Sequence, residues 1–543
     1  MIAVTFEEKL KKSAAGEIWQ EYCGFLDFSM EEYMQVQNRL LMEQVQLLSR
    51  CPLGKRLFGE EAPKSVAEFR SRVPLTSYAD YADILLLKKE DQLPAPAVTW
   101  LKTTWEGGSM PAKWAPYTQA MLDTYKTNIL AAMLLSTSNG RGDFHVRPAA
   151  RVLYSLAPMP YATGMFPDLI ASEMNLHFLP PVREARKMSF SQQTKKGYEL
   201  GIKGGMDLFF GMSSILYGAS RSLTVGSGGF GKETARRLFG MKPHMLWRLL
   251  SSLYRCRRDG TTLMPKDLFR LEGFVCVGTD SAMYKDELEA MWGRRPLELA
   301  GGTEPSCMGT ETWSKNGLCF FPDACFYEFI PEDEMRRSLK DPAYLPRTYL
   351  MNELVANQNY ELVITVLKGG AFARYRVGDV YRCLRLKNQS DGLDFPQFEY
   401  VDRIPTVIDI SGFTRITERE IEKVLDLSYL PIQNWFALKE YDANNHSFLH
   451  LYAEMKPQAT GAAASGKEII QEHLGVYFRY YDGDYKDLKK LLGVDPLQVT
   501  ILPTGTLEKY RQTFGEEIDR INPPKERVLC LLRLSEEGAM ACP

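Results

Sequence analysis

The pattern of hydrophobic and polar residues predicts helices at the start of the chain. Ser29 and Glu32 have the spacing of a capping box, in which each side chain bonds the backbone N–H of the other residue. Apolar residues then recur at helical spacing until Pro52 and Gly54 interrupt the pattern. We interpret this apolar face as core packing rather than a partner site. Its members are Tyr33, Val36, Leu40, Leu47 and Leu48.

Between about residues 95 and 400, short β-rich runs alternate with helical stretches. The runs Arg151–Tyr154, Gly273–Val277 and Tyr360–Leu367 predict strands, and residues 234–254 predict a helix. Alternation of this kind is typical of α/β proteins. We therefore expect an α/β architecture for this part of the chain.

After residue 403 the pattern changes to a shorter α+β arrangement. Thr417 and Glu420 predict the start of a helix, and strands are expected at residues 435–439 and 447–455. A run of small residues from 457 to 466 predicts a surface loop.

The length of the chain implies more than one domain. At 543 residues it exceeds what a single hydrophobic core normally supports. The change of pattern near residue 405 predicts a large N-terminal domain at residues 1–404 and a smaller C-terminal domain at residues 405–543.

Composition indicates a cytoplasmic protein without a nucleic-acid or membrane partner. Basic residues number 66 and acidic residues 68, which gives a net charge of −2, although local patches could still bind phosphates. The ten cysteines include no Cys-x-x-Cys pair, which favours reduced thiols over a zinc or disulfide framework. The N-terminus lacks a basic lead with a long apolar stretch, and no later segment has the length of a membrane span.

Two short motifs together predict a nucleotide site. A Gly-Asp pair after a strand, as in Tyr375–Val380, is usually a turn. About seventy-five residues upstream, Gly301–Glu304 adds a glycine turn, a hydroxyl and a carboxylate. Asp379 can accept hydrogen bonds from both hydroxyls of a ribose, while Glu304 can hold a Mg²⁺ that neutralises phosphate charge.

The order of these and two further motifs resembles the auxin-responsive-promoter family of acyl-acid amido synthetases. The four motifs are Gly301–Glu304, Leu318–Asp323, Phe326–Pro331 and Tyr375–Val380. That family includes the plant enzymes that conjugate jasmonate and auxin to amino acids, and its bacterial members are the more similar to this chain. It belongs to the adenylate-forming superfamily. The resemblance covers most of the chain and is most specific at residues 297–383.

The resemblance implies an ATP- and Mg²⁺-dependent ligase. Its large N-terminal adenylate-forming domain would activate a small carboxylic acid as an acyl-adenylate, and the acyl group would pass to an amine, such as an amino acid. Two alternatives remain open. One is an acyl-CoA ligase, which shares the adenylation step, and the other is a non-catalytic relative with a degenerate phosphate loop.

The resemblance also assigns roles to residues of the two central motifs. It implies that Asp379 holds the ribose, and that Thr303 and Glu304 face the phosphates and Mg²⁺. Glu304 would be the metal ligand and a catalytic residue. Arg376 is either a nucleotide-positioning residue or one half of a structural ion pair.

The glycine-rich segment Lys102–Lys113 lies where the family has its phosphate-binding loop. Ser109 and Lys113 would meet the pyrophosphate end of the nucleotide. The family's Ser/Thr-Gly-Thr-Ser core is replaced here by Trp105–Ser109, and Glu106 brings a negative charge. A solvated glycine turn is therefore the alternative interpretation.

Ala300 occupies a position where the family has an aromatic residue. Losing a ring that stacks on the adenine would forfeit about 1–3 kcal/mol. Another glycine pattern, Gly226–Glu233, matches a P-loop except that glutamate replaces the final Ser/Thr, so we interpret it as a loop between helices.

The C-terminal domain offers two candidate catalytic lysines. The segment Pro503–Lys509 resembles the terminal segment of the family, while Asn522 stands where the resemblance leads us to expect a lysine. Lys509 and Lys525 are therefore both candidates for a catalytic, phosphate-contacting lysine.

Overall fold

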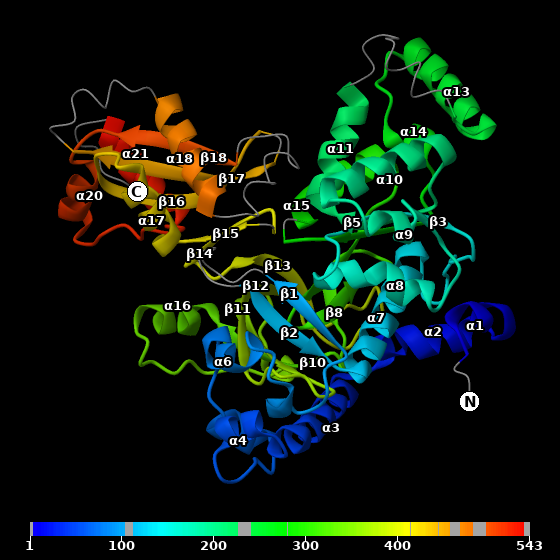
Figure 1. Ribbon diagram of the computed structural model, residues 1–543, viewed down its shortest axis with the longest axis horizontal. Helices are drawn as coiled ribbons and strands as arrows, with labels where there is room; N and C mark the ends of the chain where they lie inside the picture. The colour runs from blue at the N-terminus through cyan, green and yellow to red at the C-terminus, as the bar shows by residue number, and fades with distance from the viewer. Residues whose placement is uncertain are drawn as a thin grey trace. The chain divides into compact units, whose positions relative to one another are not determined.

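The computed structural model divides the chain into two compact units, with the boundary between Val401 and Asp402 (Figure 1). It describes residues 4–103, 112–225, 240–279, 281–412, 414–443, 445–456, 467–481 and 496–536. Among these residues, no helix is long and apolar enough to cross a membrane. The domains expected at 1–404 and 405–543 stay a prediction.

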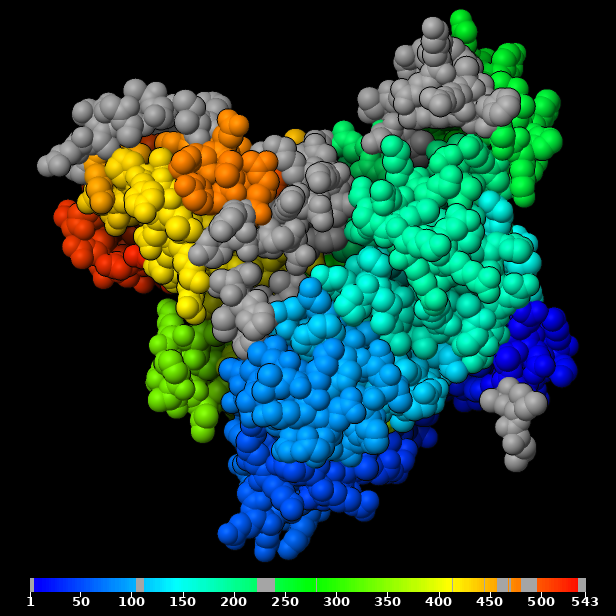
Figure 2. Space-filling model, in the orientation of Figure 1, coloured from blue at the N-terminus to red at the C-terminus, as the bar shows by residue number. Residues whose placement is uncertain are grey.

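The larger unit begins with short helices and the 20-residue helix α3. These are α1 (Phe6–Lys12), α2 (Ala15–Cys23), α3 (Met30–Ser49), α4 (Pro52–Phe58) and α5 (Val66–Arg72). The predicted capping box of α3 is confirmed, because the Ser29 backbone N–H donates to the Glu32 carboxylate at 2.8 Å and the Glu32 N–H donates to Ser29 Oγ at 3.2 Å. In Figure 2 the segments that follow α5, up to about residue 100 in mid-blue, lie on the lower part of the face of this unit that the view shows.

The buried face of α3 contains two glutamines besides apolar residues. Gln37 Nε2 donates to the Cys325 carbonyl at 2.7 Å, and Gln37 Oε1 accepts from the Tyr327 N–H at 3.0 Å. Gln44 bonds the Gly370 carbonyl in the same way, at 2.8 Å. Of the five predicted apolar positions, Val36 and Leu47 are only partly buried. The helix is thus held to the sheet by polar as well as apolar contacts.

An 11-stranded sheet forms the centre of the larger unit, which confirms the α/β expectation. Its strand order is β10-β11-β12-β13-β9-β8-β7-β6-β5-β3-β4. The five strands from β4 to β7 are parallel, and β7 pairs antiparallel with β8. In chain order, the strands are β3 (Arg151–Ser155), β4 (His177–Leu179), β5 (Leu208–Met212), β6 (Gly273–Val277), β7 (Leu297–Gly302), β8 (Ser306–Glu311), β9 (Leu318–Phe320), β10 (Cys325–Pro331), β11 (Asn359–Val366), β12 (Tyr375–Arg385) and β13 (Gln397–Arg403).

Helices cover the parallel half of the sheet. They include α7 (Gln119–Thr137), α10 (Phe190–Gly204), α11 (Ser213–Val225), α13 (Pro243–Asp259), α14 (Pro265–Leu268) and α15 (Ser281–Trp292). Helix α16 (Glu332–Lys340) lies instead beside β11, in the antiparallel half. Side chains of α11, α13, α14 and α15 form one apolar cluster with β3, β5 and β6. The helix expected at 234–254 is wrong at residues 240–242, because Gly240 has a φ of +85° and α13 begins at Pro243, which lacks an N–H. Residues 226–239 lie outside the described part.

The smaller unit is built around a three-stranded sheet. Strands β16 (Ile432–Tyr441) and β17 (Ser447–Met455) are antiparallel, and β17 pairs in parallel with β18 (Leu497–Leu502). One face packs on α17 (Glu418–Ser428) and α18 (Lys467–Tyr481), the other on α20 (Thr506–Phe514) and α21 (Lys525–Glu536). A hairpin of β14 (Val407–Ile410) and β15 (Thr414–Thr417) precedes α17. The predicted Thr417–Glu420 capping box is confirmed, and the loop predicted at 457–466 lies outside the described residues.

Candidate functional site

The Gly301–Glu304 motif lies at the carboxyl end of β7, where ligands bind in parallel α/β sheets. The pairing of β7 with β8 shifts register between Ala300 and Gly301. A Cβ atom on Gly301 would lie 2.3 Å from the Ser306 carbonyl oxygen. Only glycine permits this close approach, so the turn that presents Glu304 depends on Gly301.

Three buried side chains from distant parts of the chain, those of Lys113, Glu304 and Tyr375, contact one another. Lys113, at the start of β2 (Lys113–Tyr117), is 4% exposed, and its Nζ donates to Tyr375 Oη at 3.3 Å. Tyr375 Oη in turn donates to Glu304 Oε1 at 3.0 Å, and Lys113 Nζ lies 3.7 Å from that same oxygen. The structure thus joins two residues of the predicted site through the first residue of the Tyr375–Val380 motif.

Two further tyrosines surround this group. Tyr117 Oη donates to the Thr303 carbonyl at 2.7 Å, which fixes the motif next to Glu304. Lys113 Nζ lies 5.5 Å from the centre of the Tyr78 ring. Burial raises the pKa of Tyr78 to about 12, and the Glu304 charge acts in the same direction. Among the described residues, the surroundings of Glu304 thus include the phenols of Tyr375 and Tyr78 and the ammonium group of Lys113.

Asp379 is placed by a bulge in β12. The register pairs Glu361 with Val380 and Val363 with Arg376, so that residues 377–379 face a single residue of β11. Gly378 has a φ of +80°, which glycine adopts without strain. Bulges redirect side chains and are frequent beside active sites. The Gly-Asp pair is therefore a strand irregularity rather than a simple turn, and Asp379 is 9% exposed.

Arg376 forms a bidentate ion pair with a buried glutamate. Its Nε and Nη2 atoms donate to the two carboxylate oxygens of Glu361 at 2.8 and 2.6 Å, and Nη2 also donates to Ser338 Oγ at 3.2 Å. This geometry agrees with the second of the two roles considered for Arg376, one half of a structural ion pair.

Arg374, which the sequence did not single out, anchors the same motif from the other side. Its guanidinium donates to both oxygens of Glu328 at 3.0 and 2.9 Å, and its Nη1 donates to the Arg70 and Val73 carbonyls at 2.6 Å each. Arg374 and Glu328 are 6% and 1% exposed. Arg374 directly precedes Tyr375, so this ion pair fixes the start of β12.

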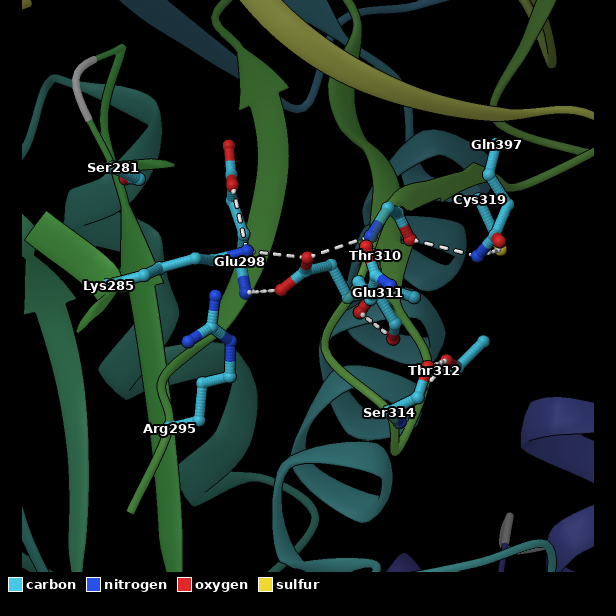
Figure 3. Close-up of polar contacts among 12 residues, drawn as sticks. Ser281, Lys285, Arg295, Glu298, Thr310, Glu311, Thr312, Ser314, Cys319 and Gln397 are labelled. Atoms are coloured by element: carbon cyan, nitrogen blue, oxygen red, sulfur yellow. Dashed lines mark hydrogen bonds and ion pairs between the residues drawn. The ribbon is translucent and has the colours of Figure 1, made fainter. Parts of the chain in front are cut away.

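A second buried charged group lies on β7 itself (Figure 3). Lys285, from α15, points toward Glu298 and Glu311, with Nζ 3.3 Å from Glu298 Oε2 and in contact with Glu311 Oε1. Glu311 Oε2 also accepts from the Glu298 backbone N–H at 2.7 Å, and Glu311 Oε1 accepts from the Gly317 N–H at 3.1 Å. In the sequence, this charged group was indicated only by Glu298, a glutamate in the otherwise apolar first half of β7.

Glu298 and Glu311 both lie beside Lys285, so a single positive charge must stabilise two carboxylates. Burial raises the pKa of Glu298 to about 7, against the opposing effect of Lys285, and the neighbouring Glu311 raises it further. Burial alone would lower the pKa of Lys285, but Glu311 and Glu298 outweigh it and raise that pKa overall. Near neutral pH, Glu298 therefore carries a proton part of the time.

Glu298→Gln should remove much of the pH dependence of stability between about pH 4.5 and 7. A carboxyl group whose pKa is higher in the folded state than in the unfolded state stabilises the fold when protonated. That stabilisation is complete below the unfolded value and is lost as the pH rises through the folded value. At pH 8 the variant should be more stable than the wild type by on the order of 2 kcal/mol. Urea denaturation at several pH values measures this, and the exposed Glu43→Gln is the control.

The two candidate lysines of the C-terminal unit are exposed. Lys509 lies on α20, and Lys525 begins α21. Asn522, found where a lysine was expected, instead ties two strands together. Its Nδ2 donates to the Val407 carbonyl at 2.9 Å and its Oδ1 accepts from the Lys439 N–H at 3.1 Å.

Ser109 and most of the glycine-rich segment, at 104–111, lie outside the described residues, as does the Gly226–Glu233 pattern. The flanking strands are described: β1 (Thr99–Thr103) pairs with β2 so that Thr103 faces Lys113. Within the described part of the chain, no group of three or more His, Cys, Asp or Glu residues is arranged to hold a metal ion.

Comparison with solved structures defines the class of fold. The chain resembles 2-hydroxyisobutyryl-CoA ligase in complex with 2-HIB-AMP and CoA, with a TM-score of 0.54, 16% identity and coverage of 88% of this chain and 87% of that chain. It also resembles the AtGH3.15 acyl acid amido synthetase in complex with 2,4-DB, with a TM-score of 0.53, 15% identity and coverage of 96% of both chains. The chain therefore has the mixed α/β fold of GH3 and adenylate-forming enzyme structures.

Within this fold, residues 318–403 match the GH3 family central domain. The chain is 24% identical over 228 residues to a probable indole-3-acetic acid-amido synthetase, GH3.2, of Oryza sativa subsp. japonica. It is 22% identical over 241 residues to the jasmonoyl–L-amino acid synthetase GH3.5 of the same organism. These matches cover 39% of this chain and 36% and 38% of the two relatives. The central domain match runs from β9 to β13 and includes Asp379.

Proposed function

We propose that this protein is an acyl-adenylate-forming ligase that joins a small carboxylic acid to an amine, such as an amino acid. The observation that carries this proposal is the buried group of Lys113, Tyr375 and Glu304 at the carboxyl end of β7, linked through β12 to the bulge at Asp379. The amido synthetases among the related proteins support the amide product.

ATP would be held by residues that already lie in fixed positions. The Asp379 carboxylate would accept hydrogen bonds from the ribose hydroxyls. Thr303 and Lys113 would face the phosphates, where the ammonium group offsets negative charge. The acid's own carboxylate would attack the α-phosphorus, with pyrophosphate as the leaving group. The protein's part is to position these groups and to stabilise charge on the phosphate oxygens.

Glu304 fits the Mg²⁺ that accompanies ATP in such a reaction. Mg²⁺ is usually held by one or two carboxylates together with phosphate oxygens and water. Glu304 is a single carboxylate with a lysine 3.7 Å away, so the other ligands would come from the nucleotide and solvent. Mg²⁺ would supply charge neutralisation at the phosphates.

Glu304→Gln should raise the Mg²⁺ concentration needed for half-maximal activity about tenfold, because the amide keeps the shape but loses the charge that attracts a hard cation. A Mg²⁺ titration of pyrophosphate exchange measures this. Glu353→Gln, an exposed carboxylate of the same unit, is the control. An unchanged Mg²⁺ requirement in Glu304→Gln would give this residue a structural role only.

Acid-dependent exchange of labelled pyrophosphate into ATP tests the proposed function directly. A panel of small carboxylic acids should include at least one that drives exchange. Adding amino acids should then release AMP and yield an amide, whereas AMP release only with coenzyme A would identify an acyl-CoA ligase. Absence of ATP binding in calorimetry would contradict the proposal and favour a non-catalytic relative.

The exposed Lys509 and Lys525 are proposed to serve the adenylation step as phosphate-contacting residues. A cytoplasmic location is proposed on the basis of the cysteines, since the nine described ones are all free thiols.

A further inference from the structure

A basic groove lies at the edge of the parallel strands opposite to Glu304. It is a cavity of about 1130 Å³, formed where the chain enters β3, β4, β5 and β6. Arg151 and His177 begin β3 and β4, while Asp207 and Glu272 directly precede β5 and β6. A five-residue strand is about 16 Å long, so this groove is a site separate from the one around Glu304.

The lining of the groove is strongly positive. Six cationic and two carboxylate side chains give it an excess of four positive charges, whereas the whole chain has a net charge of −2. Charge concentrated in a concave surface attracts counter-ions. The cationic side chains are Arg147, Arg151, Arg183, Lys242, Arg248 and Arg270.

Both carboxylates of the lining are engaged by a single arginine. Arg147 Nε donates to the two oxygens of Glu272 at 3.0 and 2.9 Å, and Arg147 Nη2 lies 3.0 Å from Asp207 Oδ1. Its hydrogen bond to Glu272 raises the pKa of Arg147 above its usual value. These carboxylates therefore neutralise Arg147 and one further positive charge, which leaves the groove with its excess of four.

Arg151 is held in the groove by the end of α10. Its Nε donates to the Gly205 carbonyl at 2.8 Å, and a Cβ atom on Gly204 would lie 2.4 Å from Arg151 Nη2. For Arg183, Lys242 and Arg270, which are exposed, no carboxylate partner is found among the described residues. Their charges thus remain available to an anion.

We propose that this groove binds a small molecule carrying at least one phosphate group. Guanidinium groups bind phosphate oxygens in a bidentate manner, and several such groups around one concave surface suit a multiply charged anion. The cavity volume lies at the upper limit of small-molecule sites, which span about 300–1,000 Å³. Leu176, Phe178 and Met206 add apolar surface for the organic part of the ligand.

The proposal can be tested by calorimetric titration of the full-length protein with inorganic tripolyphosphate. The double variant Arg183→Gln/Arg270→Gln should lose one binding event, with affinity reduced at least tenfold, and binding should weaken with added NaCl. Arg39→Gln/Arg336→Gln removes the same charge from exposed positions on α3 and α16 and should bind within twofold of the wild type. Tripolyphosphate binding at the nucleotide site would persist in the groove variant and so would be distinguished.

A second arm identifies the source of the phosphate. The wild type and the groove variant are sedimented with vesicles of phosphatidylcholine, with and without phosphatidic acid. Binding that requires phosphatidic acid and is lost in the groove variant would assign the site to a lipid headgroup, whereas tripolyphosphate binding alone assigns it to a soluble ligand. The proposal is overturned if the wild type binds neither probe, or if the groove variant, shown to be folded by circular dichroism, binds both as the wild type does.

Discussion

Asp379→Ala is expected to reduce acid-dependent ATP–pyrophosphate exchange about 10- to 150-fold. A charge-assisted hydrogen bond to a ribose hydroxyl is worth about 1.5–3 kcal/mol, and each 1.36 kcal/mol is a factor of ten in rate. Because the bulge depends on the backbone of Gly378 rather than on the Asp379 side chain, the variant should fold normally.

Two companion variants sharpen this test. Asp379→Asn keeps the shape and loses the charge, so its exchange rate should fall between those of the wild type and the alanine variant. Asp83→Ala removes an exposed carboxylate of the same unit and should leave exchange unchanged. A folded Asp379→Ala protein that exchanges at the wild-type rate would show that the ribose assignment is wrong.

Arg374→Leu should destabilise the larger unit by about 3 kcal/mol, because the buried Glu328 carboxylate loses its bidentate partner and keeps the Thr348 hydroxyl and Arg70 Nε, which lies 3.6 Å away. Two backbone carbonyls, those of Arg70 and Val73, would lose their donor at the same time. The decrease in stability is measured as a lower midpoint of urea denaturation, monitored by tryptophan fluorescence.

The double variant Arg374→Leu/Glu328→Leu separates the ion pair from simple packing. Removing both charges should restore part of the lost stability, since the buried carboxylate is removed together with its bidentate partner and Arg70 keeps Glu353 at 3.3 Å. Arg336→Ala breaks an exposed pair with Glu332 and should cost less than about 1 kcal/mol. If Arg374→Leu cost no more than that control, the anchoring role of Arg374 would be excluded.

Local sequence patterns predicted most of the helices and strands but not the side-chain contacts between them. The two capping boxes and the strands β3, β6 and β11 follow from residues adjacent in sequence, which is why they could be read directly. The non-helical residues 240–242 before α13 were missed because helical periodicity outweighed the signals of Gly240 and Pro243. The buried glutamines of α3 bond backbone groups hundreds of residues away, and periodicity carries no information on such partners.

For the candidate site, the sequence indicated the residue types but not their connections. Lys113 and Glu304 were predicted to serve one nucleotide, and the structure places them 3.7 Å apart. Tyr375, which hydrogen-bonds to both, was identified in the sequence only as the first residue of the Tyr375–Val380 motif, with no role assigned to it. The ion pair of Arg374 with Glu328 and the charged group around Glu298 were missed, because a buried charge can be recognised only once its partner is located in space.

The polar anchoring of α3 has a consequence for how the chain is made. Gln37 is separated by 288 residues from its carbonyl partner in β10, and Gln44 by 326 residues from its partner in the segment after β11. At translation rates of about 5–20 residues per second, those partners leave the ribosome about 15 to 60 s after the helix. During that interval the apolar face of α3 lacks its sheet, so the nascent N-terminus should be a substrate for chaperones until β10 and the segment after β11 have been synthesised.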